Sequence, residues 1–97
     1  MPSFRVLFHP DAVIDAREAR LWYARVDAAL GDAFADELDN AIGRIAETPL
    51  TWVHAANDQR YLLHRFPYSI VYRLRGEEIH VLAVAHLRRK PGYWRDR

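Results

Sequence analysis

Apolar residues in the first half of the chain recur at the spacing of two α-helices. In the first stretch they follow one another at steps of four, three, four, three and four: Ala12, Ala16, Ala19, Tyr23, Val26 and Leu30. Leu21 and Trp22 widen this stripe. In the second stretch they fall at Phe34, Leu38, Ala41, Ile42 and Ile45. Each set lies on one side of a helix, so the pattern predicts a helical hairpin over residues 10–48.

The expected ends of these helices follow from the residues that flank them. The pair Pro10-Asp11 suits the first turn of the first helix. Gly31 suits the residue just past its end and Asp32 suits the N-cap of the second helix, so we expect the hairpin turn there. The pair Thr48-Pro49 ends the second helix.

The remaining segments have the β-branched and aromatic composition of strands. One strand is expected over residues 4–8, and three more follow a loop at 50–59, over residues 61–66, 68–74 and 79–86. Pro67 and residues 75–78 mark the turns between them, which predicts an antiparallel meander that the first strand joins. The order β-α-α-β-β-β predicts an α+β fold, with the helical hairpin packed on one face of a small antiparallel sheet and the other face open to a ligand.

Length and composition narrow the class of protein. The 97 residues make one domain over residues 1–97, and 51% of them are hydrophobic, which is enough for a core. The sequence has no cysteine, which excludes disulfides and thiolate metal sites. It shows no signal peptide and no apolar run long enough to span a membrane, so we expect a cytoplasmic protein that does not act at a membrane.

The charge is divided unequally along the chain. Residues 1–59 hold five Arg against ten Asp and Glu, a net charge of −5, whereas residues 60–97 hold nine bases against three acids, a net charge of +6. This asymmetry indicates an anionic partner for the second half, and the alternative is a solvated basic face. Thirteen of the fourteen bases are Arg, whose planar guanidinium suits phosphate or carboxylate groups.

Residues 79–94 form an apolar strand that ends in Ala85-His86 and is followed by Arg88, Arg89 and the aromatic pair Tyr93-Trp94. This segment resembles the C-terminal half of RelE/ParE toxins of bacterial type II toxin-antitoxin systems, and it is the most specific part of the resemblance. Residues 66–73, 8–12 and 45–49 also match segments of that family. The resemblance covers nearly the whole chain. It implies the β-α-α-β-β-β fold, an adjacently encoded antitoxin that binds the toxin as a hetero-oligomer, and inhibition of bacterial growth by the free toxin.

The superfamily contains two activities that this fold hosts equally. RelE-like members are ribosome-dependent mRNA endoribonucleases, whereas ParE-like members inhibit DNA gyrase by binding. Ser69 stands where RelE-like enzymes carry a catalytic Arg, and a hydroxyl does not supply that charge. If the chain is RelE-like, its catalytic residues are His86, Arg88, Arg89 and Tyr93, in a metal-independent reaction. The ParE-like interpretation is preferred, and a third alternative is an antitoxin-binding module without toxicity.

Contacts with a target or an antitoxin are expected from the basic second half of the chain. The target is either gyrase or the ribosome with its mRNA, and the candidate contact residues are Arg60, His64, Arg65, Arg73, Arg88, Arg89 and Trp94. Structural alternatives exist for some of them: a histidine at a strand end often bonds a backbone group, and Tyr93 and Trp94 are suited to pinning the tail by packing. No cofactor is expected, and the five His lack the spacing of a metal site.

Overall fold

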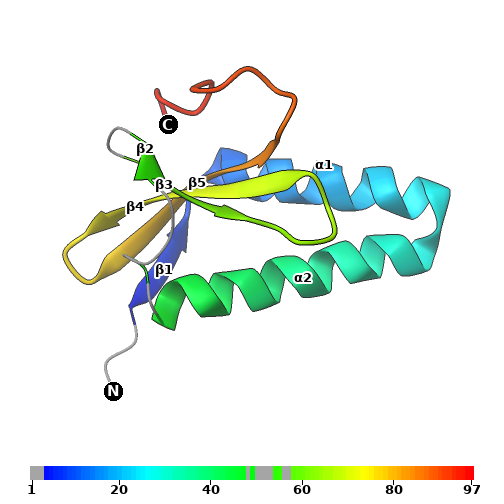
Figure 1. The fold of residues 1–97 in the computed structure, drawn as a ribbon, viewed down its shortest axis with the longest axis horizontal. Helices are drawn as coiled ribbons and strands as arrows, with labels where there is room; N and C mark the ends of the chain where they lie inside the picture. The colour runs from blue at the N-terminus through cyan, green and yellow to red at the C-terminus, as the bar shows by residue number, and fades with distance from the viewer. Residues whose placement is uncertain (1–3, 48, 50–53, 56–57) are drawn as a thin grey trace.

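The computed structural model describes residues 4–47, 49, 54–55 and 58–97, and it contains a helical hairpin packed on a sheet (Figure 1). The elements in chain order are β1 (Arg5–Phe8), α1 (Pro10–Val26), α2 (Ala28–Glu47), β2 (His54–Ala55), β3 (Asp58–Leu62), β4 (Tyr68–Arg75) and β5 (Glu78–His86). The predicted β-α-α-β-β-β order is confirmed. Within the predicted loop, the structure adds the two-residue strand β2 and starts β3 at Asp58. β3 ends at Leu62, so the strand predicted over residues 61–66 is wrong for residues 63–66, which bend towards β4.

The sheet is a meander with the N-terminal strand added at one edge. Its strand order is β1-β5-β4-β3-β2, and β3, β4 and β5 pair antiparallel as predicted. β1 runs parallel to β5, with Val6 opposite Ile79, so the complete sheet is mixed. The parallel pairing arises because the helical hairpin carries the chain from one end of the sheet back over its face. Gly76, with a φ of 60°, closes the turn between β4 and β5.

The hairpin turn lies at Asp27, so the prediction of a turn at Gly31 and Asp32 is wrong. The Asp27 side chain accepts a hydrogen bond from the Ala29 N–H at 2.9 Å, and its carbonyl accepts one from the Leu30 N–H at 2.9 Å. Asp27 is thus the N-cap of α2, since it satisfies N–H groups that have no partner within the helix. Gly31 is instead buried inside α2, where a Cβ would lie 2.8 Å from the Ala24 Cβ. It is glycine because the helices approach closely there.

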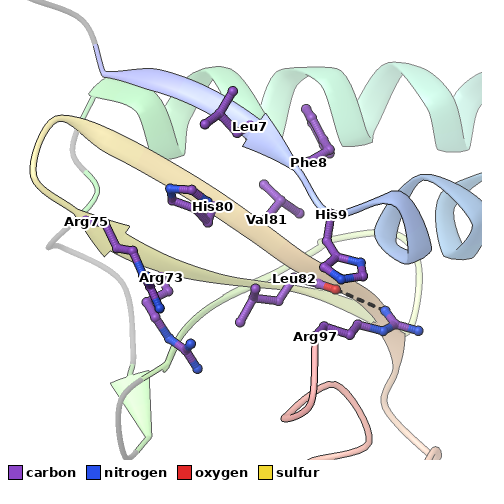
Figure 2. Close-up of a pocket in the computed structure, with 9 residues that line it drawn as sticks. All are labelled: Leu7, Phe8, His9, Arg73, Arg75, His80, Val81, Leu82 and Arg97. Carbon is purple, nitrogen blue, oxygen red and sulfur yellow. Dashed lines mark hydrogen bonds between the residues drawn. The ribbon is translucent and has the colours of Figure 1, made fainter.

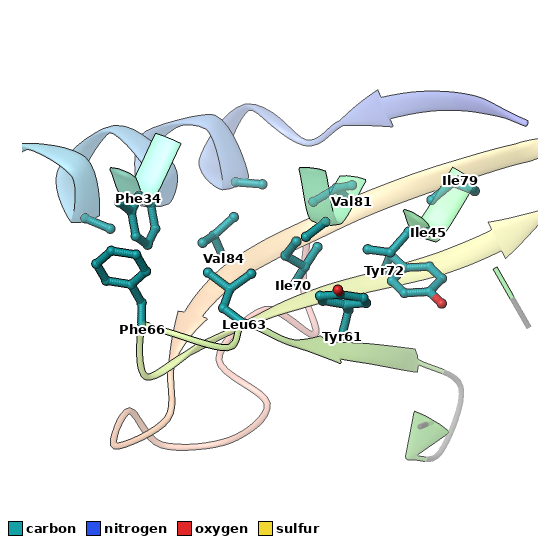
Figure 3. Close-up of a cluster of buried hydrophobic side chains, with 13 residues drawn as sticks. Phe34, Ile45, Tyr61, Leu63, Phe66, Ile70, Tyr72, Ile79, Val81 and Val84 are labelled. Atoms are coloured by element: carbon teal, nitrogen blue, oxygen red, sulfur yellow. The ribbon is translucent and has the colours of Figure 1, made fainter. Parts of the chain in front are cut away.

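The main core lies between the helices and the sheet (Figure 3). The predicted stripe of α2 is confirmed, because all five of its residues belong to this core or pack against it. On α1, Ala12, Ala16, Ala19 and Tyr23 face the core as predicted. The prediction fails for Leu21, Trp22 and Val26, which are exposed. Val26 lies at the end of the hairpin that extends beyond the sheet, so it has no strand to pack on (Figure 1).

Tyr72 is the largest fully buried side chain of this core. Its hydroxyl donates a hydrogen bond to the Pro49 carbonyl, and burial raises the pKa of Tyr72 to about 12. Tyr72 therefore stays neutral over the physiological pH range.

The second face of the sheet is covered in part by the end of the chain. Trp94, 5% exposed, packs on Val71, Leu82, Ala83 and Ala85. The expectation that this whole face is open is therefore wrong at its centre, because an indole buried there removes apolar surface from water. Among the described helices, none is long and apolar enough to cross a membrane.

The two helical glycines of α2 provide a matched pair of substitutions. Gly31→Val is expected to destabilise the protein by about 2 kcal/mol, because its side chain would overlap Ala24. Gly43→Ala is expected to stabilise it by up to about 1 kcal/mol, since nothing lies within 4 Å of a Cβ at that position. Urea denaturation measures both. Equal effects of the two substitutions would contradict the close packing at Gly31.

Candidate functional site

Asp15 of α1 fixes the C-terminal segment, residues 87–97, to the molecule. Its carboxylate accepts hydrogen bonds from Arg97 Nη1 at 2.7 Å, from the Val84 N–H at 3.2 Å and from the Tyr93 hydroxyl at 3.4 Å. Arg97 Nη1 also donates to the Leu82 carbonyl at 3.0 Å. The Asp15 and Arg97 side chains are only 9% and 13% exposed, so this ion pair is shielded from solvent. One carboxylate thus joins α1, β5 and the C-terminal segment.

Asp58 at the start of β3 fixes the same segment from the other side. One of its oxygens accepts two hydrogen bonds from Arg73, at 3.1 Å from Nε and 2.7 Å from Nη2. The other accepts the indole N–H of Trp94 at 2.9 Å. The guanidinium of Arg60 lies 5.1 Å from the centre of the Trp94 ring, in cation–π geometry. Three candidate contact residues, Arg60, Arg73 and Trp94, therefore meet in one cluster that holds the tail.

Three of the four residues predicted to be catalytic in a RelE-like enzyme lie together beside the C-terminal segment, away from the Asp58 cluster. His86, Arg89 and Tyr93 line a hollow of about 220 Å³ between α1 and the tail, which we call the tail hollow. The Arg89 guanidinium lies 3.6 Å from the centre of the Tyr93 ring, and His86 meets Tyr68 edge to face. Arg88 does not line this hollow, and its side chain is exposed.

The protonation of these groups follows from their contacts. His86 Nδ1 accepts a hydrogen bond from the Arg88 backbone N–H at 3.0 Å, so neutral His86 carries its proton on Nε2. This is the backbone contact expected of a histidine at a strand end. The pKa of Tyr93 is raised, by burial first and by the Asp15 charge second. Tyr93 is therefore a weak proton donor at neutral pH.

The tail hollow carries charges of both signs. Glu18 lines it together with the basic groups, and so does Asp15, whose carboxylate is paired with Arg97. Ser69 is 2% exposed within β4, between Leu62 and Ala85, so it offers no charge to the surface. The aromatic rings of Trp22, Tyr68 and Tyr93 line the tail hollow, and such rings can hold an aromatic or cationic group.

A third group of bases lies on the sheet beyond the tail (Figure 2). Arg73 shares a hollow of about 190 Å³, which we call the sheet hollow, with four bases that sequence reasoning did not select: Arg75, Arg97, His9 and His80. Leu7, Val81 and Leu82 supply apolar lining. The alternation of β4 places Arg73 and Arg75 on one face, and hairpin register places His80 opposite Arg73. The turn predicted at residues 75–78 sets this register, so His80 could have been found from the sequence.

His64 and Arg65 lie apart from these groups, on the side of α2. The Glu37 carboxylate accepts hydrogen bonds from the backbone N–H groups of both residues, and the distance from Arg65 N to Glu37 Oε2 is 3.2 Å. They line a hollow of about 340 Å³ with acidic and basic residues of α2, including Asp36 and Arg44. The candidate residues thus fall into separate groups, and their functional roles stay predictions.

The pinning of the C-terminal segment can be tested at Asp15. Asp15→Asn is expected to lower the free energy of unfolding by about 2 kcal/mol, because it removes the shielded carboxylate that Arg97 contacts at 2.7 Å. The matched control is Asp11→Asn in the same helix, whose carboxylate is 52% exposed and lies 3.7 Å from Arg97 Nε; its cost should be about 0.5 kcal/mol. Denaturant titration compares them. Equal losses would show that Asp15 has no special role.

Comparison with known proteins places this geometry in a family. The model of the family described as the ParE toxin of type II toxin-antitoxin system, parDE, matches residues 6–91. Among solved structures, a chain of the chromosomal ParDE TA system from P. aeruginosa is similar, with a TM-score of 0.75 and 14% sequence identity, over 87% of this chain and 96% of that one. At this identity the similarity shows a shared fold. A search of curated protein sequences finds no match.

The family match includes β5 and the start of the C-terminal segment, where the sequence resemblance was most specific. It also includes both helices, the pinning residues Asp15 and Asp58, and the buried Ser69. Because the match spans most of the sequence, this chain belongs to the ParE family of toxins of type II toxin-antitoxin systems, within the RelE/ParE superfamily.

Proposed function

We propose that this toxin arrests growth by binding and inhibiting DNA gyrase, and that it does not cut RNA. The observation that carries the proposal is Ser69, which is buried in β4. The resemblance of residues 66–73 to RelE/ParE toxins implies that RelE-like enzymes carry a catalytic Arg at this position. A nuclease needs cations around the phosphate to stabilise the charge that develops during cleavage. An inhibitor that acts by binding needs no such group.

The contacts of the other arginines of residues 60–97 support a role in binding. Arg73 and Arg97 are each bonded to an Asp carboxylate, and Arg60 lies over the Trp94 ring. These cations hold the C-terminal segment in place, so we assign them to the structure of the contact surface. Arg88 is exposed at the start of that segment, and we propose it as a direct contact with the target. Arg89, stacked on Tyr93, would lie beside it.

The antitoxin is the second partner in this proposal. The net charge of +6 over residues 60–97 suits a partly acidic segment that folds as it binds, since opposite charge speeds association and neutralises the basic surface. His64 and Arg65, on the side of α2, extend this surface beyond the tail. Because gyrase acts on the bacterial chromosome, the proposal places the free toxin in the cytoplasm.

RelE-like cleavage stays the second candidate, because His86, Arg89 and Tyr93 share one hollow. A neutral His with its proton on Nε2 and an adjacent guanidinium are groups that proton transfer and phosphate binding use. Ribosome-bound message therefore belongs in the same test as gyrase.

The experiment adds purified toxin to gyrase with relaxed plasmid and ATP, and in parallel to ribosomes that are translating a defined message. We expect supercoiling to be inhibited and the message to stay intact. Arg88→Ala should weaken inhibition about tenfold, because it removes a charge at the edge of an interface without touching the core. Arg17→Ala, an exposed Arg of α1, is the control and should leave inhibition unchanged.

Each arm has an outcome that overturns the proposal. Normal supercoiling at a large excess of toxin, together with cut message, would establish the RelE-like alternative. Normal supercoiling with intact message and no growth defect in cells would establish an antitoxin-binding module without toxicity.

A further inference from the structure

The sheet hollow is lined by bases and apolar side chains. Three arginines and two histidines line it, and the other four lining residues are apolar, so no acid of the described part of the chain lines it. The tail hollow and the hollow beside α2 differ, because Asp and Glu residues line both of them. A negative group that enters the sheet hollow therefore meets positive and apolar surroundings.

Two of the three arginines are already matched by carboxylates. Arg73 is paired with Asp58 at 2.7 Å, and Arg97 is paired with Asp15 at 2.7 Å. The Arg75 side chain has no hydrogen bond and no ion pair with a residue in the described part of the chain. The hollow therefore contains one guanidinium whose charge is not matched by an acid that contacts it.

Glu78 lies opposite Arg75 in the pairing of β4 with β5, but its carboxylate is bonded elsewhere. One of its oxygens forms an ion pair with Arg5, and the other lies 3.1 Å from His80 Nε2. Arg75 thus keeps its positive charge and the five N–H donors of its guanidinium available to a ligand.

Further donors lie at both ends of the hollow. Arg73 bonds Asp58 through Nε and Nη2, and its Nη1 has no hydrogen-bond partner among the described residues. His9 Nδ1 accepts the Asp11 N–H at 3.0 Å, so neutral His9 carries its proton on Nε2 and can donate it. Figure 2 shows Arg73 and Arg75 at one end of the hollow and His9 at the other, with apolar side chains between them.

We propose that the sheet hollow binds one carboxylate side chain of the antitoxin. Both oxygens of that carboxylate accept hydrogen bonds from Arg75, and a neighbouring apolar group of the antitoxin lies against Leu7 and Leu82. A carboxylate carries the one negative charge that one unmatched guanidinium neutralises. The hollow of about 190 Å³ is smaller than the roughly 300–1,000 Å³ of small-molecule pockets, so it suits a single side chain.

An acidic peptide fits this hollow better than nucleic acid does. Duplex DNA presents a row of phosphates, with one charge per about 1.7 Å of its axis, and it requires a row of unmatched cations. The sheet hollow offers one such cation and an apolar lining.

The sheet hollow also lies away from the residue that we propose for the target. Arg75 pairs with Glu78 at the start of β5, whereas Arg88 follows the end of β5, roughly 25 Å along the strand. This inference rests on the antitoxin named in the proposed function and deepens it, because it states where on the toxin one acid of that partner is held.

The dissociation constant of the purified toxin and the antitoxin encoded beside it, measured by surface plasmon resonance, tests the proposal. Arg75→Ala should weaken binding about tenfold and Arg75→Glu about a hundredfold, because they remove and then reverse the unmatched charge. Arg75→Lys should weaken it about threefold, since an ammonium keeps the charge but lacks the planar pair of donors. Arg17→Glu, the same charge change at an exposed residue of α1, is the control and should stay within about twofold of wild type.

A charge exchange identifies the acid that occupies the hollow. Each Asp and Glu of the antitoxin is replaced by Arg in turn, and each variant is measured against the Arg75→Glu toxin. One of these antitoxin variants should recover at least about tenfold in affinity for that toxin and bind wild-type toxin more weakly, because opposite charges again face each other.

Three results would overturn the proposal. The first is wild-type affinity in Arg75→Ala, and the second is a scan in which no antitoxin variant recovers binding to Arg75→Glu. The third is a loss of duplex-DNA binding in Arg75→Ala, measured by fluorescence anisotropy, with antitoxin affinity unchanged, which would assign the hollow to phosphate. Circular dichroism of the variants should match that of wild type, since Arg75 is exposed. These measurements need no gyrase, so this proposal and gyrase inhibition fail separately.

Discussion

Two shielded carboxylates, Asp15 and Asp58, hold the surface of this toxin together. Each accepts hydrogen bonds from the C-terminal segment and from a second element, and each neutralises a guanidinium that would otherwise be costly to shield from water. Because the acids come from α1 and β3, the C-terminal segment is fixed at one point on a helix and at one point on the sheet. Trp94 is then able to bury its ring on β4 and β5, and the hollows on either side of the tail acquire their shape.

The part of the fold that depends on local pattern could be predicted from sequence. The apolar stripe of α2 and the meander of β3, β4 and β5 are confirmed, since helical and strand periodicity follow directly from burial. The hairpin turn was misplaced, because Gly31 has the sequence signature of a helix end but serves close helix packing. The roles of Asp15 and Asp58 could not be predicted from the sequence, because nothing in the pattern distinguishes these two acids from the other acids of residues 1–59. Their partners lie far away along the chain, and no local pattern connects them.

The same carboxylates determine which arginines are paired within the molecule and which stay exposed. The sequence presented the second half as one arginine-rich surface, but Arg73 and Arg97 are paired with acids and Arg60 supports Trp94. Arg88 stays exposed at the start of the tail, and His64 and Arg65 face α2. Trp22 lines the tail hollow and is 61% exposed.

The C-terminal segment of the free toxin is pinned to the sheet through Asp58 and Trp94. Hydrogen exchange of the Trp94 indole N–H, followed by NMR, measures this most directly, because that proton is bonded to Asp58 and the ring is buried. We expect exchange that is orders of magnitude slower than in an unstructured peptide, and faster exchange in Asp58→Asn. An indole proton that exchanges at the unstructured rate in the wild-type toxin would contradict it.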